Sequence, residues 1–241
     1  IAVNKINLKI YRGTIHGFIG PNGAGKTTTI KMLIGAVKPT KGMAFIFGEP
    51  VGSVKAKSYL GYAPEHPNFY SMAAIDYLIY MGMLSGLERG EARRKAKELL
   101  DLFNLYDFRE KNANTFSAGM KQKLCLAQAL ISDPEILILD EPTADLDPLL
   151  KKQIWDLIRE INKKGTTIIV ASHFLKEIEN ICDRIAILHQ GKIIAVGSPE
   201  TLKKHYKSLG EVQITSQPGD YKKIISYLRS AKHLDIEDYK I

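Results

Sequence analysis

The sequence is poor in the features that mark secreted, membrane-spanning or metal-stapled proteins. Its only two cysteines, Cys125 and Cys182, form no CxxC or Cys/His pattern, which argues against a disulfide framework or a structural zinc site. No apolar run reaches the roughly 18 residues that a bilayer span requires. Polar side chains interrupt the first twelve residues, unlike the apolar stretch of a signal peptide. The sequence therefore predicts a soluble protein of a reducing compartment.

The composition is that of a globular protein with a modest excess of positive charge. Hydrophobic residues make up 45% of the 241 residues and charged residues 25%, which excludes a disordered tail or a fibrous repeat. Lys and Arg number 34 against 26 Asp and Glu, for a formal net charge of +8. The lysines are spread along the chain, so a solvated basic surface is favoured. An acidic partner, such as nucleic acid, a phosphate ligand or an anionic membrane face, is the alternative.

Short apolar runs alternate with helical patterns along most of the chain, as in an α/β fold with a mostly parallel sheet. Residues 15–20, 135–139 and 166–171 have the length and aliphatic content of buried parallel strands. Residues 184–188 and 192–196 form a predicted hairpin, which adds an antiparallel β portion. A helix is predicted after Asp147, a candidate N-cap that is followed by proline at the first helical position.

The middle of the chain has a different pattern. Apolar residues between 73 and 132 recur at helical spacing and no strand is evident, which predicts an inserted α-helical subdomain. The α/β core would then consist of residues 1–72 and 133–205. Residues 206–241 change pattern again, with a strand predicted at 211–215 and a helix at 221–229, as in a partial C-terminal α/β extension.

The strongest local motif is a glycine-rich loop between a predicted strand and a predicted helix. Residues 20–27 satisfy G-x-x-x-x-G-K-[ST], a pattern whose backbone N–H groups and helix N-terminus surround phosphates. Lys26 can reach the β- and γ-phosphates, and the Thr27 hydroxyl can bind Mg²⁺. The predicted nucleotide-binding residues are Gly20, Pro21, Asn22, Gly23, Ala24, Gly25, Lys26, Thr27 and Thr28.

Two adjacent carboxylates, Asp140 and Glu141, end one of the predicted buried strands. One acid suffices to hold Mg²⁺, and the second can polarise an attacking water. A further candidate is Ser117, a natural N-cap followed by small residues that would let a phosphate approach the N–H groups of a helix. By itself, this serine is more typical of an ordinary helix cap.

Taken in order, these motifs resemble those of the nucleotide-binding subunits of ATP-binding cassette (ABC) transporters. The resemblance covers residues 1–205 and rests on the phosphate loop, on residues 117–122, on Asp140 and Glu141, on Asp147, and on His173 after a strand. It implies a P-loop NTPase (RecA-like) core with an inserted helical subdomain. Residues 117–122 and 197–202 are most similar to the ATPase subunits of type-2 exporters.

The resemblance also implies roles for the matching residues. Lys26 would bind phosphate, Glu141 would be the general base and His173 would contact the γ-phosphate. Asp147 would belong to a loop that crosses the dimer interface. Magnesium ligands would be Thr27, Asp140 and Glu65, where Glu65 replaces the glutamine usual in the family. The signature that covers ATP bound to the opposite subunit would consist of Ser117, Ala118, Gly119 and Met120.

This chain departs from the family pattern in several places besides Glu65. Ala118 replaces the first glycine of the signature, and Met120 replaces its usual glutamine. The family also has an aromatic residue upstream of the phosphate loop that stacks on adenine, and Tyr11 lies too close to Gly20 to match it. We therefore expect a strand that carries this aromatic residue before residue 1.

The function implied by the resemblance is ATP hydrolysis that powers an ABC transporter, of the exporter kind. ATP and Mg²⁺ would be the ligands, and the subunit would close as a homo- or heterodimer against separate transmembrane permease subunits. It would lie at the cytoplasmic face of the membrane, with no nucleic acid as partner. A non-transport ABC ATPase for DNA repair or assembly is the alternative. Only 51 residues separate Glu65 from Ser117, which is too few for the coiled-coil arms of the repair proteins.

Overall fold

A computed structural model describes residues 1–207 of the chain, with side chains to residue 204. The chain divides into two compact units, Ile1–Lys203 and Lys204–Ile241. The strand and the helix predicted at 211–215 and 221–229 lie outside the described residues. The last described element is α8 (Pro199–Lys207). None of the helices within residues 1–207 has both the length and the apolar character needed to cross a bilayer.

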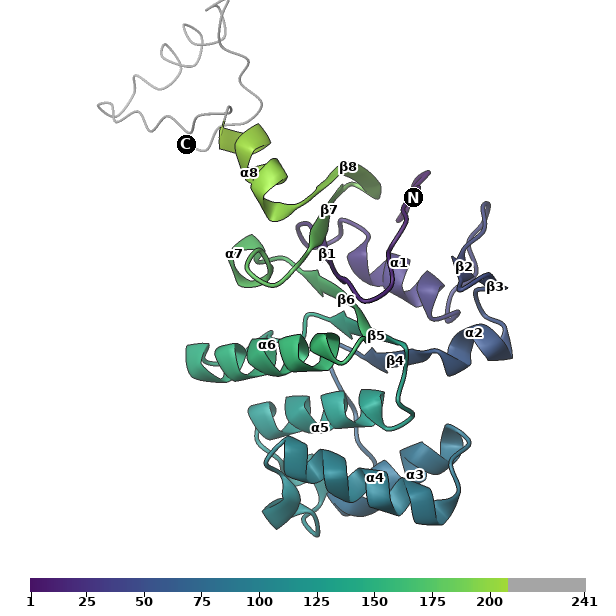
Figure 1. Cartoon of the computed structure of the whole chain (residues 1–241), viewed down its shortest axis with the longest axis vertical. Coiled ribbons are helices and arrows are strands. Elements are labelled where there is room, and N and C mark those ends of the chain that lie inside the picture. Colours follow the sequence, from purple (N-terminus) through teal and green to yellow (C-terminus); the bar gives the residue numbers. More distant parts are fainter. Residues whose placement is uncertain (208–241) are drawn as a thin grey trace, which may run out of the picture. The chain divides into compact units, whose positions relative to one another are not determined.

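A six-stranded sheet forms the centre of the first unit, in the order β4-β5-β6-β1-β7-β8 (Figure 1). Neighbouring strands are parallel except at the β7–β8 hairpin, where they are antiparallel. A separate two-stranded hairpin consists of β2 (Phe45–Ile46) and β3 (Glu49–Pro50). The mostly parallel sheet and its antiparallel portion are therefore confirmed. The six strands are β1 (Ile15–Ile19), β4 (Leu60–Ala63), β5 (Ile136–Asp140), β6 (Thr167–Ser172), β7 (Arg184–His189) and β8 (Lys192–Gly197).

Both faces of the sheet are buried, which explains why its central strands are unbroken aliphatic runs. Ile136 and Ile138 of β5 belong to one hydrophobic cluster, together with Ile30 of α1 (Lys26–Leu33). Leu137 and Leu139 alternate with them and belong to the other cluster. The helices that contribute to the second cluster include α5 (Ala118–Leu130), α6 (Pro148–Lys163) and α7 (Leu175–Ile178). The short helix α2 (Val54–Ser58) contributes its buried alanine to the first.

The chain between β4 and β5 is helical, as the spacing of its apolar residues predicts. It contains α3 (Ala74–Leu84), α4 (Arg89–Leu102), two 3₁₀ turns at Tyr106–Phe108 and Ala113–Thr115, and then α5. Ala92, Ala96 and Leu100 lie on one side of α4 and are fully buried. Figure 1 shows α3, α4 and α5 grouped below the sheet.

Helix α6 begins as the sequence predicts. The Asp147 carboxylate accepts hydrogen bonds of 3.0 Å from the N–H groups of Leu149 and Leu150, and Pro148 occupies the first turn. The helix buries Ile154, Ile158 and Ile161, together with Trp155.

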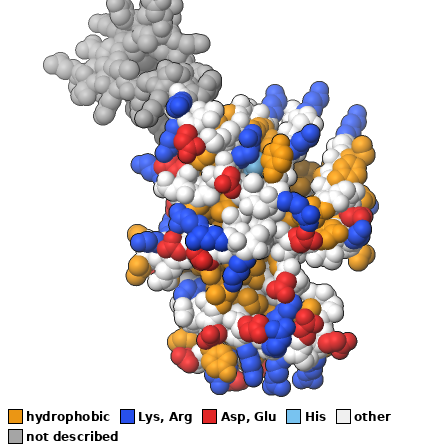
Figure 2. All heavy atoms as spheres, in the orientation of Figure 1, with side chains coloured by type: hydrophobic (Ala, Val, Ile, Leu, Met, Phe, Trp, Pro, Cys, Tyr) orange, Lys and Arg blue, Asp and Glu red, His pale blue; other side chains and the backbone are white. Residues whose placement is uncertain are grey.

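Figure 2 shows basic and acidic side chains interspersed over the visible face, with no large block of one sign.

Candidate functional site

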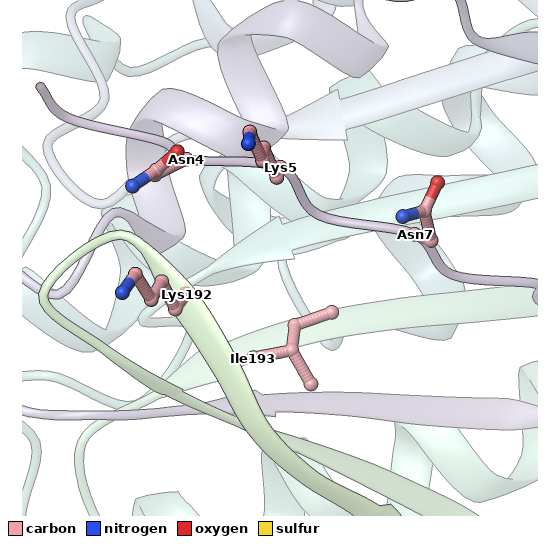
Figure 3. A pocket seen from close by; sticks show the side chains of 5 residues that line it. All are labelled: Asn4, Lys5, Asn7, Lys192 and Ile193. Carbon is pink, nitrogen blue, oxygen red and sulfur yellow. The ribbon is translucent and has the colours of Figure 1, made fainter.

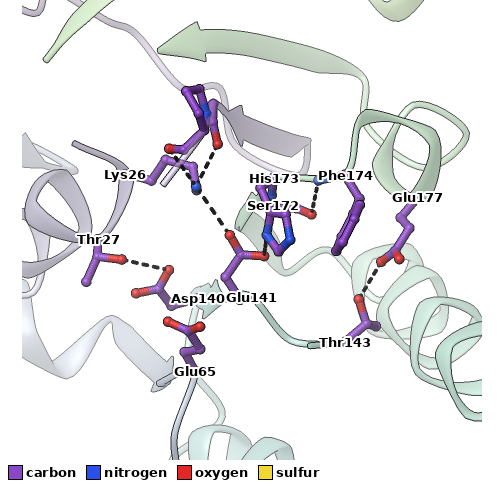
Figure 4. Close-up of polar contacts among 12 residues, drawn as sticks. Lys26, Thr27, Glu65, Asp140, Glu141, Thr143, Ser172, His173, Phe174 and Glu177 are labelled. Atoms are coloured by element: carbon purple, nitrogen blue, oxygen red, sulfur yellow. Dashed lines mark hydrogen bonds and ion pairs between the residues drawn. The ribbon is translucent and has the colours of Figure 1, made fainter. Parts of the chain in front are cut away.

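Three neighbouring parallel strands end at one edge of the sheet, and each leads into a predicted site segment (Figure 4). The phosphate loop, Gly20–Thr27, follows β1, while Asp140 ends β5 and Ser172 ends β6. Because β6 lies between β5 and β1, residues far apart in sequence meet at this edge. Ligands of open α/β sheets bind outside the carboxyl ends of the strands, as here.

The backbone of the phosphate loop needs glycine where it turns. Gly25 has a φ of +102°, and a β-carbon at this position would lie 2.5 Å from the carbonyl oxygen of Ala2. Either feature excludes an L side chain. Gly25 also precedes α1 without any side-chain cap, so the first N–H groups of the helix are open to a ligand. This arrangement fits a phosphate group.

Lys26 is buried at the mouth of this loop, with 6% of its side chain exposed. Its ammonium group donates hydrogen bonds to the carbonyl oxygens of Gly20, at 2.7 Å, and Pro21, at 3.4 Å. It also lies 3.3 Å from Oε1 of Glu141. The positive charge is thus held inside the loop by groups that a phosphate would replace.

Glu141 lies between Lys26 and His173. Its Oε1 faces Lys26, and its Oε2 lies 2.9 Å from Nδ1 of His173. Its φ of +48° is unusual for a residue with a side chain. The conformation is held by a 3.0 Å hydrogen bond from the Glu141 N–H to the Ala171 carbonyl on β6. The strained backbone therefore directs this carboxylate toward the loop.

Asp140 has different surroundings, although it is the adjacent residue. It is 1% exposed, and its Oδ1 accepts a 3.3 Å hydrogen bond from the Thr27 hydroxyl. Burial is the largest cause of its raised pKa, and the charges of Glu65 and Glu141 act in the same direction, against Thr27 and Lys26. Figure 4 shows the Glu65 carboxylate next to that of Asp140. Two carboxylates and a hydroxyl are oxygen ligands of the kind that Mg²⁺ prefers.

These oxygen atoms could hold Mg²⁺ only with help from a bound phosphate. Residues 1–207 contain no group of three or more His, Cys, Asp or Glu side chains arranged to hold a metal ion. Glu65 also remains partly exposed and lies 3.8 Å from Nε2 of His66. Magnesium is commonly bound through one or two carboxylates, water and substrate phosphates, and that is the arrangement these residues fit.

The predicted signature and the predicted interface loop lie side by side. Ser117 caps α5, and its hydroxyl accepts a 3.3 Å hydrogen bond from the Met120 N–H. A β-carbon at Gly119 would lie 2.6 Å from Cδ1 of Leu150, in the turn of α6 that Asp147 caps. Ser117, Ala118 and Asp147 are exposed. Their exposure leaves them free to contact a second chain.

Comparison with known proteins agrees with this arrangement. A family profile described as "ABC transporter" matches residues 3–144, more than half of the chain. The chain belongs to the ABC transporter family. Its fold is that of the P-loop ATPase cassettes, and the family assignment with these cassettes indicates an ATP-hydrolysing enzyme.

The curated relatives include ATP-binding proteins named for transport and for drug resistance. The bacitracin transport ATP-binding protein BcrA of Bacillus licheniformis is 38% identical over 244 residues, covering 100% of this chain and 77% of BcrA. The daunorubicin/doxorubicin resistance ATP-binding protein DrrA of Streptomyces peucetius is 36% identical, covering 84% of this chain and 62% of DrrA. These relatives favour a transport ATPase over a DNA-repair or assembly factor. Among the most similar curated relatives, the chain spans 56–77% of their length.

Solved structures of ABC cassettes share the fold. CbiO1 of Clostridium perfringens, described as part of the ABC transporter complex cbiONQ, superposes with a TM-score of 0.76 at 28% identity, covering 86% of each chain. The cassette MJ0796, solved as a dimer bound to ADP and Pi, has a TM-score of 0.75 at 25% identity, covering 82% of this chain and 90% of MJ0796.

One group of residues in this ABC subunit escaped the sequence analysis. The Thr143 hydroxyl donates a 2.6 Å hydrogen bond to Oε2 of Glu177, and Lys151 lies 2.7 Å from Oε1 of the same carboxylate. Glu177 follows His173 by four residues on α7. The one available signal in the sequence was the position of Glu177 four residues after His173. This position by itself does not distinguish Glu177 from the other charged residues nearby.

A pocket of about 430 Å³ lies beside the N-terminal segment of this ABC subunit and the start of β8 (Figure 3). Polar side chains dominate its lining, which consists of Asn4, Lys5, Asn7, Lys192 and Ile193. None of the predicted catalytic, nucleotide-binding or metal residues lines it. The neighbouring Gly191 donates a 3.0 Å hydrogen bond to the Ala24 carbonyl, so this hairpin supports the outside of the phosphate loop.

Proposed function

We propose that this chain is the ATP-hydrolysing subunit of an ABC exporter, acting as a dimer with separate membrane permease chains at the cytoplasmic face of the membrane. The observation that supports hydrolysis most directly is the contact of the buried Lys26 and Glu141 at the phosphate loop, with His173 beside Glu141. The names of BcrA and DrrA, which refer to bacitracin transport and drug resistance, support export.

ATP binding would rearrange the contacts of Lys26. In the structure its ammonium group is held by two loop carbonyls and by Glu141. The β- and γ-phosphates would compete for this cation, and Glu141 would then be free to accept a proton from water. The remaining phosphate ligands would be the N–H groups of the loop and the side chains of Thr27 and Thr28. His173 would orient the γ-phosphate.

Magnesium would be held by the oxygen atoms of Thr27, Asp140 and Glu65. Bound there, Mg²⁺ would neutralise charge on the β- and γ-phosphate oxygens. Asp140 is kept close to Thr27 by their hydrogen bond, and Glu65 approaches from the chain segment after β4. Glu65 thereby connects the metal site to the start of the helical subdomain, which we place at residues 73–132 of an ATPase domain spanning 1–205.

A working site would need two chains. Gly119, at the centre of the predicted signature, lies against Leu150 in the first turn of α6. We propose that the signature residues cover ATP bound to the other subunit, with Asp147 at the shared interface. The dimeric MJ0796 structure shows that such cassettes dimerise.

Mixing two inactive variants tests hydrolysis and dimerisation together. Glu141→Gln removes the base, and Ser117→Arg blocks the signature, so each variant alone should release little phosphate from ATP. In a mixed dimer one composite site keeps its own Glu141 and the intact signature of its partner. Activity should therefore return in the mixture, up to half that of wild type if every dimer is mixed. No recovery, while both variants still bind ATP and dimerise, would contradict the shared site.

The helical subdomain offers an exposed apolar surface for the permease. Tyr70 and Tyr80 have 57% and 40% of their surface exposed, and their rings are in edge-to-face contact. Tyr80 lies on α3, and Met83 and Leu84 are exposed at the end of this helix. Tyr77, also on α3, is instead buried, and its hydroxyl donates a 2.6 Å hydrogen bond to Gln128. Phe69 and Met72 are partly buried.

Cysteine crosslinking can locate the permease contact. Cysteines introduced at Tyr70 or Tyr80 should crosslink to a co-expressed permease, whereas a cysteine at the exposed Lys41 serves as a control in the α/β core. Crosslinks formed only from residues 211–241 would move the contact away from the helical subdomain.

A further inference from the structure

Glu177 connects segments that carry the proposed catalytic and interface residues. It lies on α7, four residues after His173, and most of its side chain is buried, with 18% exposed. One carboxylate oxygen accepts from the Thr143 hydroxyl at 2.6 Å, and the other lies 2.7 Å from the Lys151 ammonium group. Thr143 follows Glu141 by two residues, and Lys151 lies in the first turn of α6.

Figure 4 shows His173 and Phe174 between Glu141 and the Thr143–Glu177 pair. The His173 and Phe174 rings have centroids 3.8 Å apart, and the Lys151 ammonium group lies 5.1 Å from the centroid of the Phe174 ring. Lys151 in turn pairs with Glu177, on the same short segment as His173 and Phe174. Charge-assisted hydrogen bonds of this length are strong and directional, so they restrict where the segment can lie.

The first turn of α6 carries the connection further. Lys151 follows Leu150, which packs against Gly119 of the signature and whose N–H is capped by Asp147. A movement of α6 would therefore displace Leu150 relative to Gly119. The same movement would displace the His173 segment, because Lys151 and Glu177 join that segment to α6. The helix is a rigid element between the two.

We propose that Glu177 is a positioning residue that holds the His173 segment against Thr143 and Lys151, so that the γ-phosphate contact of His173 is coupled to the signature and interface loop. Within the described residues, no hydrogen bond or ion pair joins Glu177 to Glu141 or to the phosphate loop, so we propose that it acts on the reaction through the position of His173. This inference rests on the proposed ATPase function. Within residues 1–204, Glu177 is the one side chain whose hydrogen bonds link Thr143 and Lys151 to the His173 segment.

The test is steady-state ATP hydrolysis by the full chain carrying Glu177→Ala. A displacement of about 1 Å of a catalytic group can reduce turnover about 100-fold, so we expect kcat to fall by about 10- to 100-fold. The KM for ATP and the affinity for ADP should stay within about twofold, because His173 addresses the γ-phosphate and the phosphate loop is unchanged. Glu177→Gln keeps an oxygen for Thr143 and should fall between wild type and Glu177→Ala.

A double substitution separates positioning from general stability. Lys151→Met alone and Glu177→Gln alone should each lower kcat, and the double variant should lose less than the product of the two, because the residues share one interaction. The matched control is Glu179→Ala, on the residue that follows α7. Its carboxylate is equally buried and lies 3.1 Å from Lys203, in a pair that does not reach α6. This variant should keep the wild-type kcat.

Turnover is counted per ADP-binding site, so that unfolded protein does not lower it. The inference is overturned if Glu177→Ala has a kcat within twofold of Glu179→Ala, or if the Lys151 and Glu177 effects multiply independently. It is also overturned if ADP affinity falls as much as kcat does. A wild-type chain that binds ATP but never hydrolyses it, even as a dimer with permease, would instead contradict the proposed function.

Discussion

Buried polar side chains have bonding partners at the carboxyl edge of the sheet but not in its interior. At the edge, Lys26, Asp140 and Glu141 are nearly inaccessible, and each has a partner of opposite charge or a hydrogen bond. His16, in the middle of β1, is fully buried, and neither of its ring nitrogen atoms has a hydrogen-bond partner in the described chain. Both regions belong to the same six-stranded sheet.

The comparison shows two ways in which a protein accommodates a polar group out of water. At the edge, side chains of opposite charge, a hydroxyl group and backbone carbonyl groups take the place of water around the polar atoms. In the interior, burial, assisted by the charge of Arg184, lowers the pKa of His16 to about 4, so the ring is neutral near pH 7. The side chains at the edge can exchange their present partners for a ligand. In the interior, protonation of His16 can only destabilise the folded state.

The largest effect is expected at the edge, from Glu141→Gln. This change removes the base but keeps the size of the side chain and a hydrogen-bond acceptor for His173. General-base assistance contributes about 10²- to 10⁴-fold, so turnover should fall by that factor while ATP binding persists and ATP-bound dimers accumulate. Glu160→Gln, at an exposed position of α6, is the control. Turnover within a few-fold of wild type would remove Glu141 from the role of base.

In the interior, His16→Leu should alter the pH dependence of stability. The folded pKa of His16, about 4, lies below that of an unfolded histidine. The unfolded chain therefore binds more protons at mildly acidic pH. The contribution to stability is full above about pH 6.5 and is lost as the pH falls toward 4, by about 2–3 kcal/mol in total. Urea unfolding of both proteins from pH 7 to pH 4 measures it.

The carboxylates of the protein titrate in the same range, so the informative quantity is the difference between wild type and His16→Leu at each pH. This difference should favour the variant increasingly as the pH falls. At pH 7 leucine should be tolerated, because it leaves no unpaired polar atom in the sheet. Parallel stability curves for the two proteins would show that His16 does not titrate as its burial implies.

Lys26→Ala should act on binding at the edge. Hydrogen bonds to charged groups contribute about 1.5–3 kcal/mol, so ATP affinity should fall by about 10- to 100-fold. Calorimetric titration with ATP measures this change. Lys31→Ala, at the exposed end of the same helix, is the matched control. An unchanged affinity in Lys26→Ala would contradict the role of the loop as a phosphate site.

The smallest effect is expected from Glu65→Gln, on the carboxylate side of the edge. Glu65 adds negative charge beside Asp140, so ATP binding without Mg²⁺ should be weaker than with glutamine. Because Glu65 is partly exposed, the change should be modest, at most about fivefold in ATP affinity in the presence of a chelator. The Mg²⁺ dependence of ATP hydrolysis should weaken in the same variant. Identical titrations would leave Glu65 as a hinge residue outside the metal site.

Much of the architecture follows from local sequence patterns. The strands 15–20, 135–139 and 166–171 are predicted by aliphatic runs whose burial on both faces the structure confirms. The start of α6 is predicted by Asp147 and Pro148, because capping depends only on neighbouring residues. The phosphate loop is recognisable for the same reason, since its glycines answer requirements of the local backbone.

Which side chains face one another was decided by the tertiary structure. The pairing of Lys26 with Glu141 requires β5 and β1 to lie on either side of β6, and strand order is a property of the whole sheet. Tyr77 and Tyr80 lie on the same helix but only Tyr77 is buried, because the rotation of α3 against its neighbours depends on packing.

The sequence by itself determined the elements, the caps, the phosphate loop and the order of the motifs, because each depends on residues within a few positions of one another. The tertiary structure alone decided that Glu177 meets Thr143 and Lys151, that Gly119 packs on Leu150, and that His16 has no partner. Contacts of this kind depend on how strands are ordered and how helices are rotated against them. Hydrophobic periodicity constrains both only weakly, since it specifies which face is buried but not what lies opposite.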